Sequence, residues 1–76
     1  MSRFPALKEK EVIKTLGRLG FFLHHQRGSH AQFKHPDGRR TTVPVHGGKD
    51  IGKKTVHAIL QDIHISSEEF LKVLRG

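Results

Sequence analysis

With 76 residues the chain is long enough for one small domain with a thin core, and the absence of cysteine excludes disulfides, thiolate zinc sites and a cysteine nucleophile. The net charge of +7, before any histidine is counted, favours a polyanionic partner such as nucleic acid. No segment is apolar over the length of a signal peptide or a transmembrane helix, so we expect a cytoplasmic protein with no membrane partner.

The first predicted element is a helix over residues 8–19. Its apolar side chains recur at helical spacing and form one stripe: Val12, Ile13, Leu16 and Leu19. Gly20 is placed to end the helix in the left-handed conformation. A short strand over residues 21–26 follows, and Gly28 and Ser29 interrupt it.

The next two predicted strands, residues 30–35 and 41–45, form a hairpin around the turn Pro36-Asp37-Gly38. Alternation directs one set of side chains to the core and leaves the other set on an open face. That second set is His30, Gln32, Lys34, Thr42 and His46. Pro44 has no N–H to donate to a neighbouring strand, so the last strand is expected to lie at an edge of the sheet or to end there.

Two more helices are predicted. Residues 52–62 carry a second apolar stripe, and a third helix begins after Ser66, which forms a capping-box pattern with Glu69. The element order predicts an α+β protein: an α-β-β-β-α arrangement with a three-stranded antiparallel sheet, helices on one face and a short extra C-terminal helix. This order resembles the double-stranded RNA-binding domain, an analogy that does not decide function.

The basic residues and histidines are concentrated in the middle of the chain, where the hairpin is predicted, and His30 is a candidate for RNA chemistry there. Residues 24–57 contain seven Lys or Arg, two acids and six of the seven histidines. RNA carries its own nucleophile, the 2′-hydroxyl, so cleavage needs a base, an acid and cations for the phosphate, without a metal or cofactor. Histidine suits the proton steps. Lys34 shares the face of His30, and Arg27, Arg39 and Lys49 are expected to reach it from loops. Composition alone favours the simpler alternative, that His30 is a surface histidine in a phosphate-binding patch or caps a turn.

Two other patterns carry less information. The histidines lack the spacing and nearby carboxylates of a metal site, so no metal site is predicted. The glycines and lysines of residues 47–55 precede a helix and suit phosphate binding at its N-terminus, although the spacing is not that of a Walker A loop. A solvated charged loop explains them equally well.

The ordered motifs resemble the HicA-type toxins of HicA–HicB toxin–antitoxin systems, and the resemblance runs from about Lys8 to Leu74. Its pieces are Leu16-Gly17-Arg18-Leu19-Gly20-Phe21, Gly28-Ser29-His30, Phe33, Pro36-Asp37-Gly38, Val43-Pro44-Val45-His46, Gly48-Lys49, Thr55, Ile59-Leu60 and Ile65-Ser66-Ser67-Glu68-Glu69-Phe70. The sequence departs from the family pattern at Lys54 and His64, where glycine is common. His64 is expected to carry modest strain if its φ is positive.

The resemblance implies one toxin domain over residues 1–76 that cleaves mRNA, with His30 as the catalytic histidine and no cofactor. It also implies a HicB-type antitoxin that covers the site, in a hetero-oligomer or beside a homo-oligomer of the toxin. The predicted RNA contacts are Arg27, Ser29, Lys34, Arg39, His46 and Lys49, with His46 also a candidate for the second proton transfer. The alternatives are a non-catalytic RNA-binding module of the same fold and a protein-interaction domain with an acidic partner.

Overall fold

A computed structural model describes residues 6–76. The expectation that the N-terminal stretch is no signal peptide falls partly on residues 1–5, which lie outside the described residues. The elements in chain order are β1 (Leu7–Lys8), α1 (Glu9–Arg18), β2 (Phe22–Arg27), β3 (His30–Lys34), β4 (Arg40–Pro44), β5 (Asp50–Ile51), α2 (Lys53–Ile63) and α3 (Ser67–Arg75). The predicted α-β-β-β-α arrangement with an extra C-terminal helix is confirmed, with boundaries shifted by no more than one residue.

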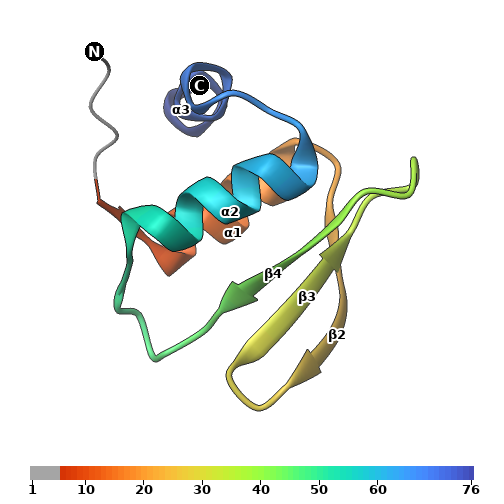
Figure 1. The fold of residues 1–76 in the computed structure, drawn as a ribbon, viewed down its shortest axis with the longest axis vertical. Helices are drawn as coiled ribbons and strands as arrows, with labels where there is room; N and C mark the ends of the chain where they lie inside the picture. Colours follow the sequence, from red (N-terminus) through yellow and green to blue (C-terminus); the bar gives the residue numbers. More distant parts are fainter. Residues whose placement is uncertain (1–5) are drawn as a thin grey trace.

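The main sheet is antiparallel with strand order β2-β3-β4, so β4 lies at an edge, as Pro44 predicts. Figure 1 shows α1 and α2 on one side of this sheet and α3, seen end-on, on the side of these two helices that is turned away from the sheet. The buried side chains of β3 and β4 alternate along the strands and meet the helices: Ala31, Phe33, Thr41 and Val43. The opposite face is left open.

The helices end as their sequences predict. Gly20 follows α1 with φ of 98°, and the backbone N–H of Phe21 donates to the carbonyl of Leu16 at 2.9 Å, which closes a Schellman motif. His64 occupies the same position after α2 with φ of 56°, so the expected strain is present. The hydroxyl of Ser66 accepts from the backbone N–H of Glu69, which confirms the predicted cap of α3.

The helices are also joined by side chains that the sequence patterns do not reveal. Arg18, at the end of α1, donates to the carbonyls of Val73 and Leu74 at 3.0 and 3.2 Å. It therefore satisfies two carbonyls in the last turn of α3, which have no partner inside that helix. Phe70 is fully buried where α3 meets the rest of the core.

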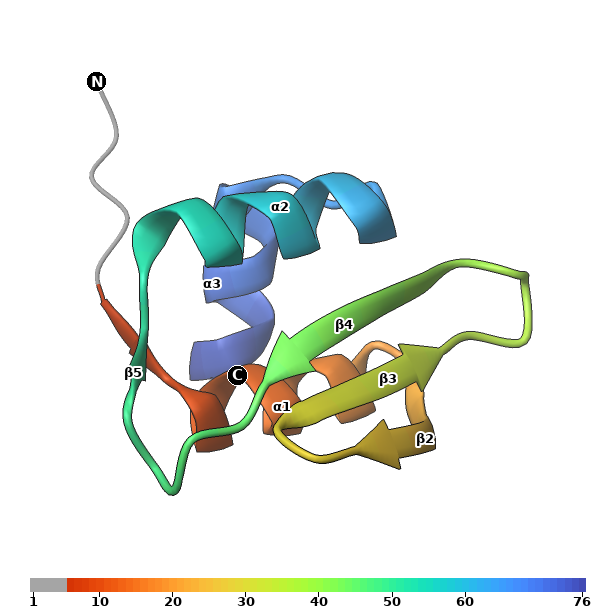
Figure 2. The same cartoon turned by 60° about the horizontal axis from the view of Figure 1, so that its bottom comes forward.

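A second, smaller sheet was not predicted. Leu7 and Lys8 pair in antiparallel register with Ile51 and Asp50, which brings β1 against β5 (Figure 2). Both strands are only two residues long, too short for any periodic pattern. The pair fixes the N-terminus of α1 beside the segment that leads into α2.

β2 differs from the other strands of the main sheet because no helix covers it. All six of its residues are exposed, including Phe22 and Leu23, whose side chains are 48% and 52% accessible. Figure 2 shows β2 at the margin of the sheet farthest from α2. The strand is therefore held chiefly by its ladder with β3.

Candidate nucleic-acid interface

His30 is the first residue of β3, and its side chain is exposed on the open face of the sheet. It follows a tight turn in which Gly28 has φ of 58°, a conformation that glycine adopts without strain. Arg27 lies directly opposite His30 in the β2–β3 register. Because directly opposed residues of antiparallel strands point to the same face, the guanidinium and the imidazole are neighbours.

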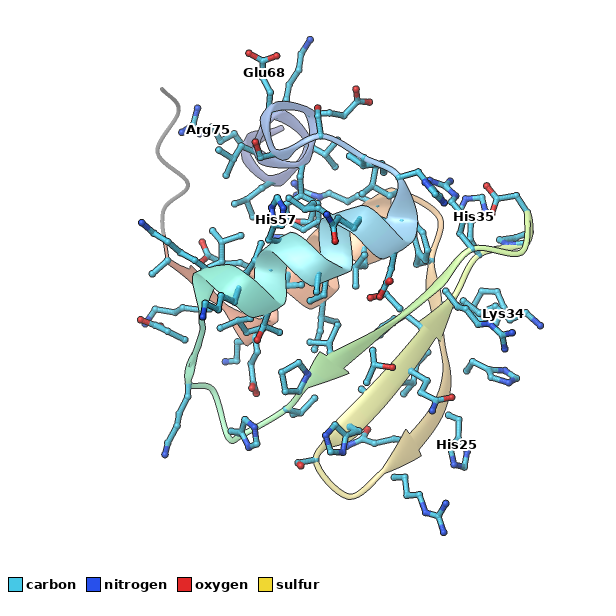
Figure 3. All side chains as sticks on the ribbon, in the orientation of Figure 1. His25, Lys34, His35, His57, Glu68 and Arg75 are labelled. Atoms are coloured by element: carbon cyan, nitrogen blue, oxygen red, sulfur yellow. The ribbon has the colours of Figure 1, made fainter. Side chains whose placement is uncertain are left out.

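The strand registers define the open face as three rows of side chains that run across the sheet. The rows are Arg27–His30–Pro44, His25–Gln32–Thr42 and Phe22–Lys34–Arg40. Every charged or titratable side chain in these rows is basic or a histidine. Figure 3 shows His25 and Lys34 on the side of the sheet that faces away from α1 and α2. This face can therefore attract and hold a polyanion.

A β-bulge determines which side chains of β2 join the open face. The register with β3 shifts between Leu23 and His25, so His24 is the extra residue. Leu23 opposes Phe33 on the helix side of the sheet, whereas His25 opposes Gln32 on the open side. Without the bulge, simple alternation would place His25 and Arg27 on the helix side.

His46 lies at the same end of the sheet as His30. The backbone N–H of Val45 donates to the carbonyl of Ser29 at 2.7 Å, which fastens the segment after β4 to the Gly28-Ser29 turn. His46 comes next in the chain and is exposed. Figures 1 and 2 both show this segment beside the β2–β3 turn.

The carboxylate of Glu9 holds the segment that contains His46. Glu9 is buried, with 7% of its surface accessible, and its two oxygens accept from the backbone N–H groups of His46 and Gly48, each at 2.8 Å. The backbone N–H of Glu9 in turn donates to the carbonyl of Lys49 at 3.4 Å. Lys49 is therefore fixed beside the N-terminus of α1, three residues past His46.

The opposite end of the sheet contains Arg39, and there it has structural partners. Its guanidinium donates to Oδ2 of Asp37 at 2.8 Å and to the carbonyl of Ile63, and it lies over the ring of Phe21 at 5.2 Å. His35 packs edge-on against the same ring, with the centroids 4.9 Å apart. Arg39 thus ties the β3–β4 turn to the end of α2.

Asp37 is the acid of this turn. The backbone N–H of Arg39 donates to its carboxylate, and this hydrogen bond, together with the guanidinium of Arg39 and the nearby His35, lowers the pKa of Asp37. The carboxylate is on the surface, so solvent screens much of the effect. Asp37 neutralises Arg39 and leaves it less available to a phosphate.

The structure divides the predicted contact residues between the two ends of the sheet. Arg27, Ser29 and His46 lie near His30, and Lys49 lies past them at the β1–β5 pair. Lys34 is on the open face but four residues along β3 from His30, which corresponds to about 13 Å. Arg39 lies beyond Lys34, in the region of the β3–β4 turn.

Sequence reasoning missed three contributors to this surface. Arg40 pairs with Lys34 and belongs to the open face, as its alternation with Thr41 could have indicated. His25 depends on the bulge, which no pattern in the sequence reveals. Glu9 looks like an ordinary acid in the first turn of a helix, and its partners are 37 and 39 residues away along the chain.

Within residues 6–76, no three His, Cys, Asp or Glu side chains gather where they could share a metal ion. No helix in the same part of the chain has the length and apolar character needed to cross a membrane.

The family model described as the HicA toxin of bacterial toxin–antitoxin systems matches residues 10–65. The match includes α1 except for its first residue, Glu9, together with the whole main sheet, β5 and α2, so it contains the open face and His30. No curated protein matches the chain.

Proposed function

Because the chain belongs to the HicA toxin family of bacterial toxin–antitoxin systems, we propose that it is a toxin that cleaves mRNA with His30 and without a metal ion. The observation that carries the proposal is the exposed His30 on a face whose other charged side chains are all cationic. Residues 1–76 form a single toxin domain in this proposal, since both sheets and all three helices described share one core.

The proposed reaction is attack of the RNA 2′-oxygen on the adjacent phosphorus. The P–O5′ bond breaks, and the products are a 2′,3′-cyclic phosphate and a free 5′-hydroxyl. His30 takes the proton of the 2′-hydroxyl or delivers one to the departing 5′-oxygen, because imidazole exchanges protons near neutral pH. His46, at the same end of the sheet, is the candidate for the other transfer.

The cations near His30 would bind the reacting phosphate and its neighbours. Arg27 lies opposite His30 and can donate to a phosphate through two N–H groups at once. Ser29 and Lys49 are contacts for the flanking phosphates, and Lys34 binds a phosphate farther along the strand. We assign Arg39 a structural role instead, because its guanidinium already has Asp37 and Ile63 as partners.

Family membership implies an antitoxin partner, which we propose to be a HicB-type protein. Its binding surface would be acidic and would cover the open face, since the same cations that attract RNA attract carboxylates. Such a complex would prevent RNA from reaching His30.

The test is a cleavage assay with EDTA throughout. The chain, its His30→Ala variant and a His57→Ala control would be incubated with labelled single-stranded RNA and with DNA of the same sequence. His57 is exposed on α2, away from the sheet (Figure 3). We expect the parent and His57→Ala to cut RNA only, and His30→Ala to be slower by about 10²- to 10⁴-fold.

Circular dichroism should show that His30→Ala remains folded, because an exposed side chain contributes little packing. Cleavage of DNA, loss of activity in EDTA or full activity of His30→Ala would refute the proposed chemistry. Binding of RNA by all three proteins without any cleavage would instead identify a non-catalytic RNA-binding module.

A further inference from the structure

A polar hollow lies at the free edge of β4, next to the open face. It is lined by Gln32, Arg40, Thr41, Thr42 and Asp62. These side chains come from β3, β4 and the end of α2, so the hollow is built by three elements of the fold. They offer an amide, a guanidinium, two hydroxyls and a carboxylate, a mixture of donors and acceptors that suits the edge of a planar polar ligand.

The backbone of β4 adds to this set of polar groups. His35 donates to the carbonyl of Arg39 at 2.8 Å and Val45 donates to that of Ser29 at 2.7 Å, one bond at each end of the β3–β4 ladder. Along an antiparallel strand, successive residues direct their backbone N–H and carbonyl groups alternately to one side and the other. The N–H and carbonyl groups of the odd-numbered residues of β4 therefore face β3. The N–H and carbonyl of Thr42 therefore point outward at the free edge of β4, the edge beside which the hollow lies.

Asp62 sets the chemistry of the hollow. Its Oδ2 accepts from the hydroxyl of Thr41 at 2.9 Å, which fixes the carboxylate and leaves Oδ1 for another donor. Within residues 6–76 the ion pairs closer than 4 Å all involve Asp37, so Asp62 is in none of them. A carboxylate repels phosphate, so the hollow does not suit the phosphate groups that the neighbouring cationic face attracts. It suits another part of the same polyanion, a part that carries N–H donors.

We infer that this hollow binds the base of an RNA nucleotide and selects bases that carry an exocyclic amino group. This inference rests on the proposed RNA-binding role of the open face. Adenine, cytosine and guanine carry an amino group that can donate to Asp62, whereas uracil has only a single N3–H, flanked by two carbonyl oxygens that the carboxylate repels. The planar guanidinium of Arg40 can stack on the base or donate to it.

The position of the hollow relative to His30 fits a base next to the scissile bond. Gln32 follows His30 by two residues on the same face, a separation of about 7 Å along β3. An extended RNA strand advances by a similar distance per nucleotide. A phosphate at the Arg27–His30 row would thus bring a neighbouring base to Gln32, Thr42 and Asp62.

The experiment measures binding separately from cleavage. Fluorescently labelled 2′-O-methyl octamers of adenine, cytosine or uracil have no 2′-hydroxyl nucleophile, so they bind without being cut. Their affinities for the full chain would be compared with those for Asp62→Asn, which keeps the size of the side chain and an acceptor for Thr41. Asp50→Asn is the matched control, because it removes an exposed carboxylate on β5 and changes the net charge equally.

We expect the parent and Asp50→Asn to bind adenine and cytosine octamers about tenfold more tightly than uracil. In Asp62→Asn the ratio should fall below about threefold, because an amide can donate to the uracil carbonyl. Equal binding of all three octamers by the parent, or an unchanged ratio in Asp62→Asn, would overturn the inference. Base selection without any RNA cleavage would support base binding by the hollow and refute only the catalytic part of the proposed function. Cleavage without base selection would refute base binding by the hollow and leave the catalytic proposal standing.

Discussion

The buried carboxylate of Glu9 allows a quantitative test of how the His46 segment is held. In Glu9→Gln the side chain keeps its size, but one of the two oxygens becomes an NH₂ group that faces a backbone N–H. Of the two hydrogen bonds at 2.8 Å, one is lost and the other no longer has a charged acceptor. Hydrogen bonds to charged groups contribute about 1.5–3 kcal/mol and neutral ones about 1 kcal/mol.

We therefore expect Glu9→Gln to lower the free energy of unfolding by about 2–5 kcal/mol. In a domain of this size that corresponds to a fall in Tm of roughly 10 °C or more, measured by circular dichroism. Glu68→Gln, which changes an exposed acid in the first turn of α3, is the control and should shift the free energy of unfolding by less than about 0.5 kcal/mol.

Hydrogen exchange locates the effect within the molecule. In Glu9→Gln the amide protons of His46 and Gly48 should exchange faster through local opening of their segment. The amide protons of β3 and β4 should exchange faster only to the extent that the free energy of global unfolding has fallen. A Tm within about 3 °C of the parent, or unchanged exchange at both amides, would show that water replaces the carboxylate without loss and would refute the reasoning.

Three further substitutions test local features of the fold. His64→Gly should raise the free energy of unfolding by about 1 kcal/mol in urea denaturation, because glycine adopts φ of 56° without strain; a destabilised variant would contradict this. Gly20→Ala should lower it by at least about 1–2 kcal/mol, since φ is 98° and the new Cβ would lie 2.8 Å from Nε2 of His35; a neutral result would mean that the ring moves aside easily. The pKa of Asp37 is lowered from 3.8 on folding, so its stabilising effect is present above that value and is lost as the pH falls through the lower, folded value. Asp37→Asn should therefore make the Tm less dependent on pH below about 4, and an unchanged pH profile would exclude Asp37 as a contributor.

The sequence was sufficient for features that depend on neighbouring residues. The apolar stripes of α1 and α2, the alternation in β3 and β4, and the cap at Ser66 all involve positions a few residues apart, so their patterns are visible in the chain. Gly20 and Pro44 were predictable for the same reason, because their restrictions belong to the residue itself.

Features that depend on distant partners could not be predicted. The backbone groups that donate to Glu9 lie in the segment after β4, 37 and 39 residues farther along the chain. Arg39 donates to Ile63 at the end of α2, which is 24 residues away. The bulge at His24 arises from the pairing of β2 with β3, and no periodic pattern in the amino-acid sequence marks it. The candidate site was therefore predicted in its central histidine and basic character, but His25, Arg40 and the hollow beside Asp62 required the structure.

The uncovered β2 has a consequence for handling the isolated protein. Its outer edge presents unpaired N–H and carbonyl groups, and exposed Phe22 and Leu23 lie on opposite faces beside that edge. Such an edge can pair with a second copy, and the positive charge of each molecule opposes that contact. Multivalent anions such as phosphate or sulfate bind to a cationic surface and neutralise part of its charge, so light scattering should detect larger particles in those buffers than in chloride at equal ionic strength.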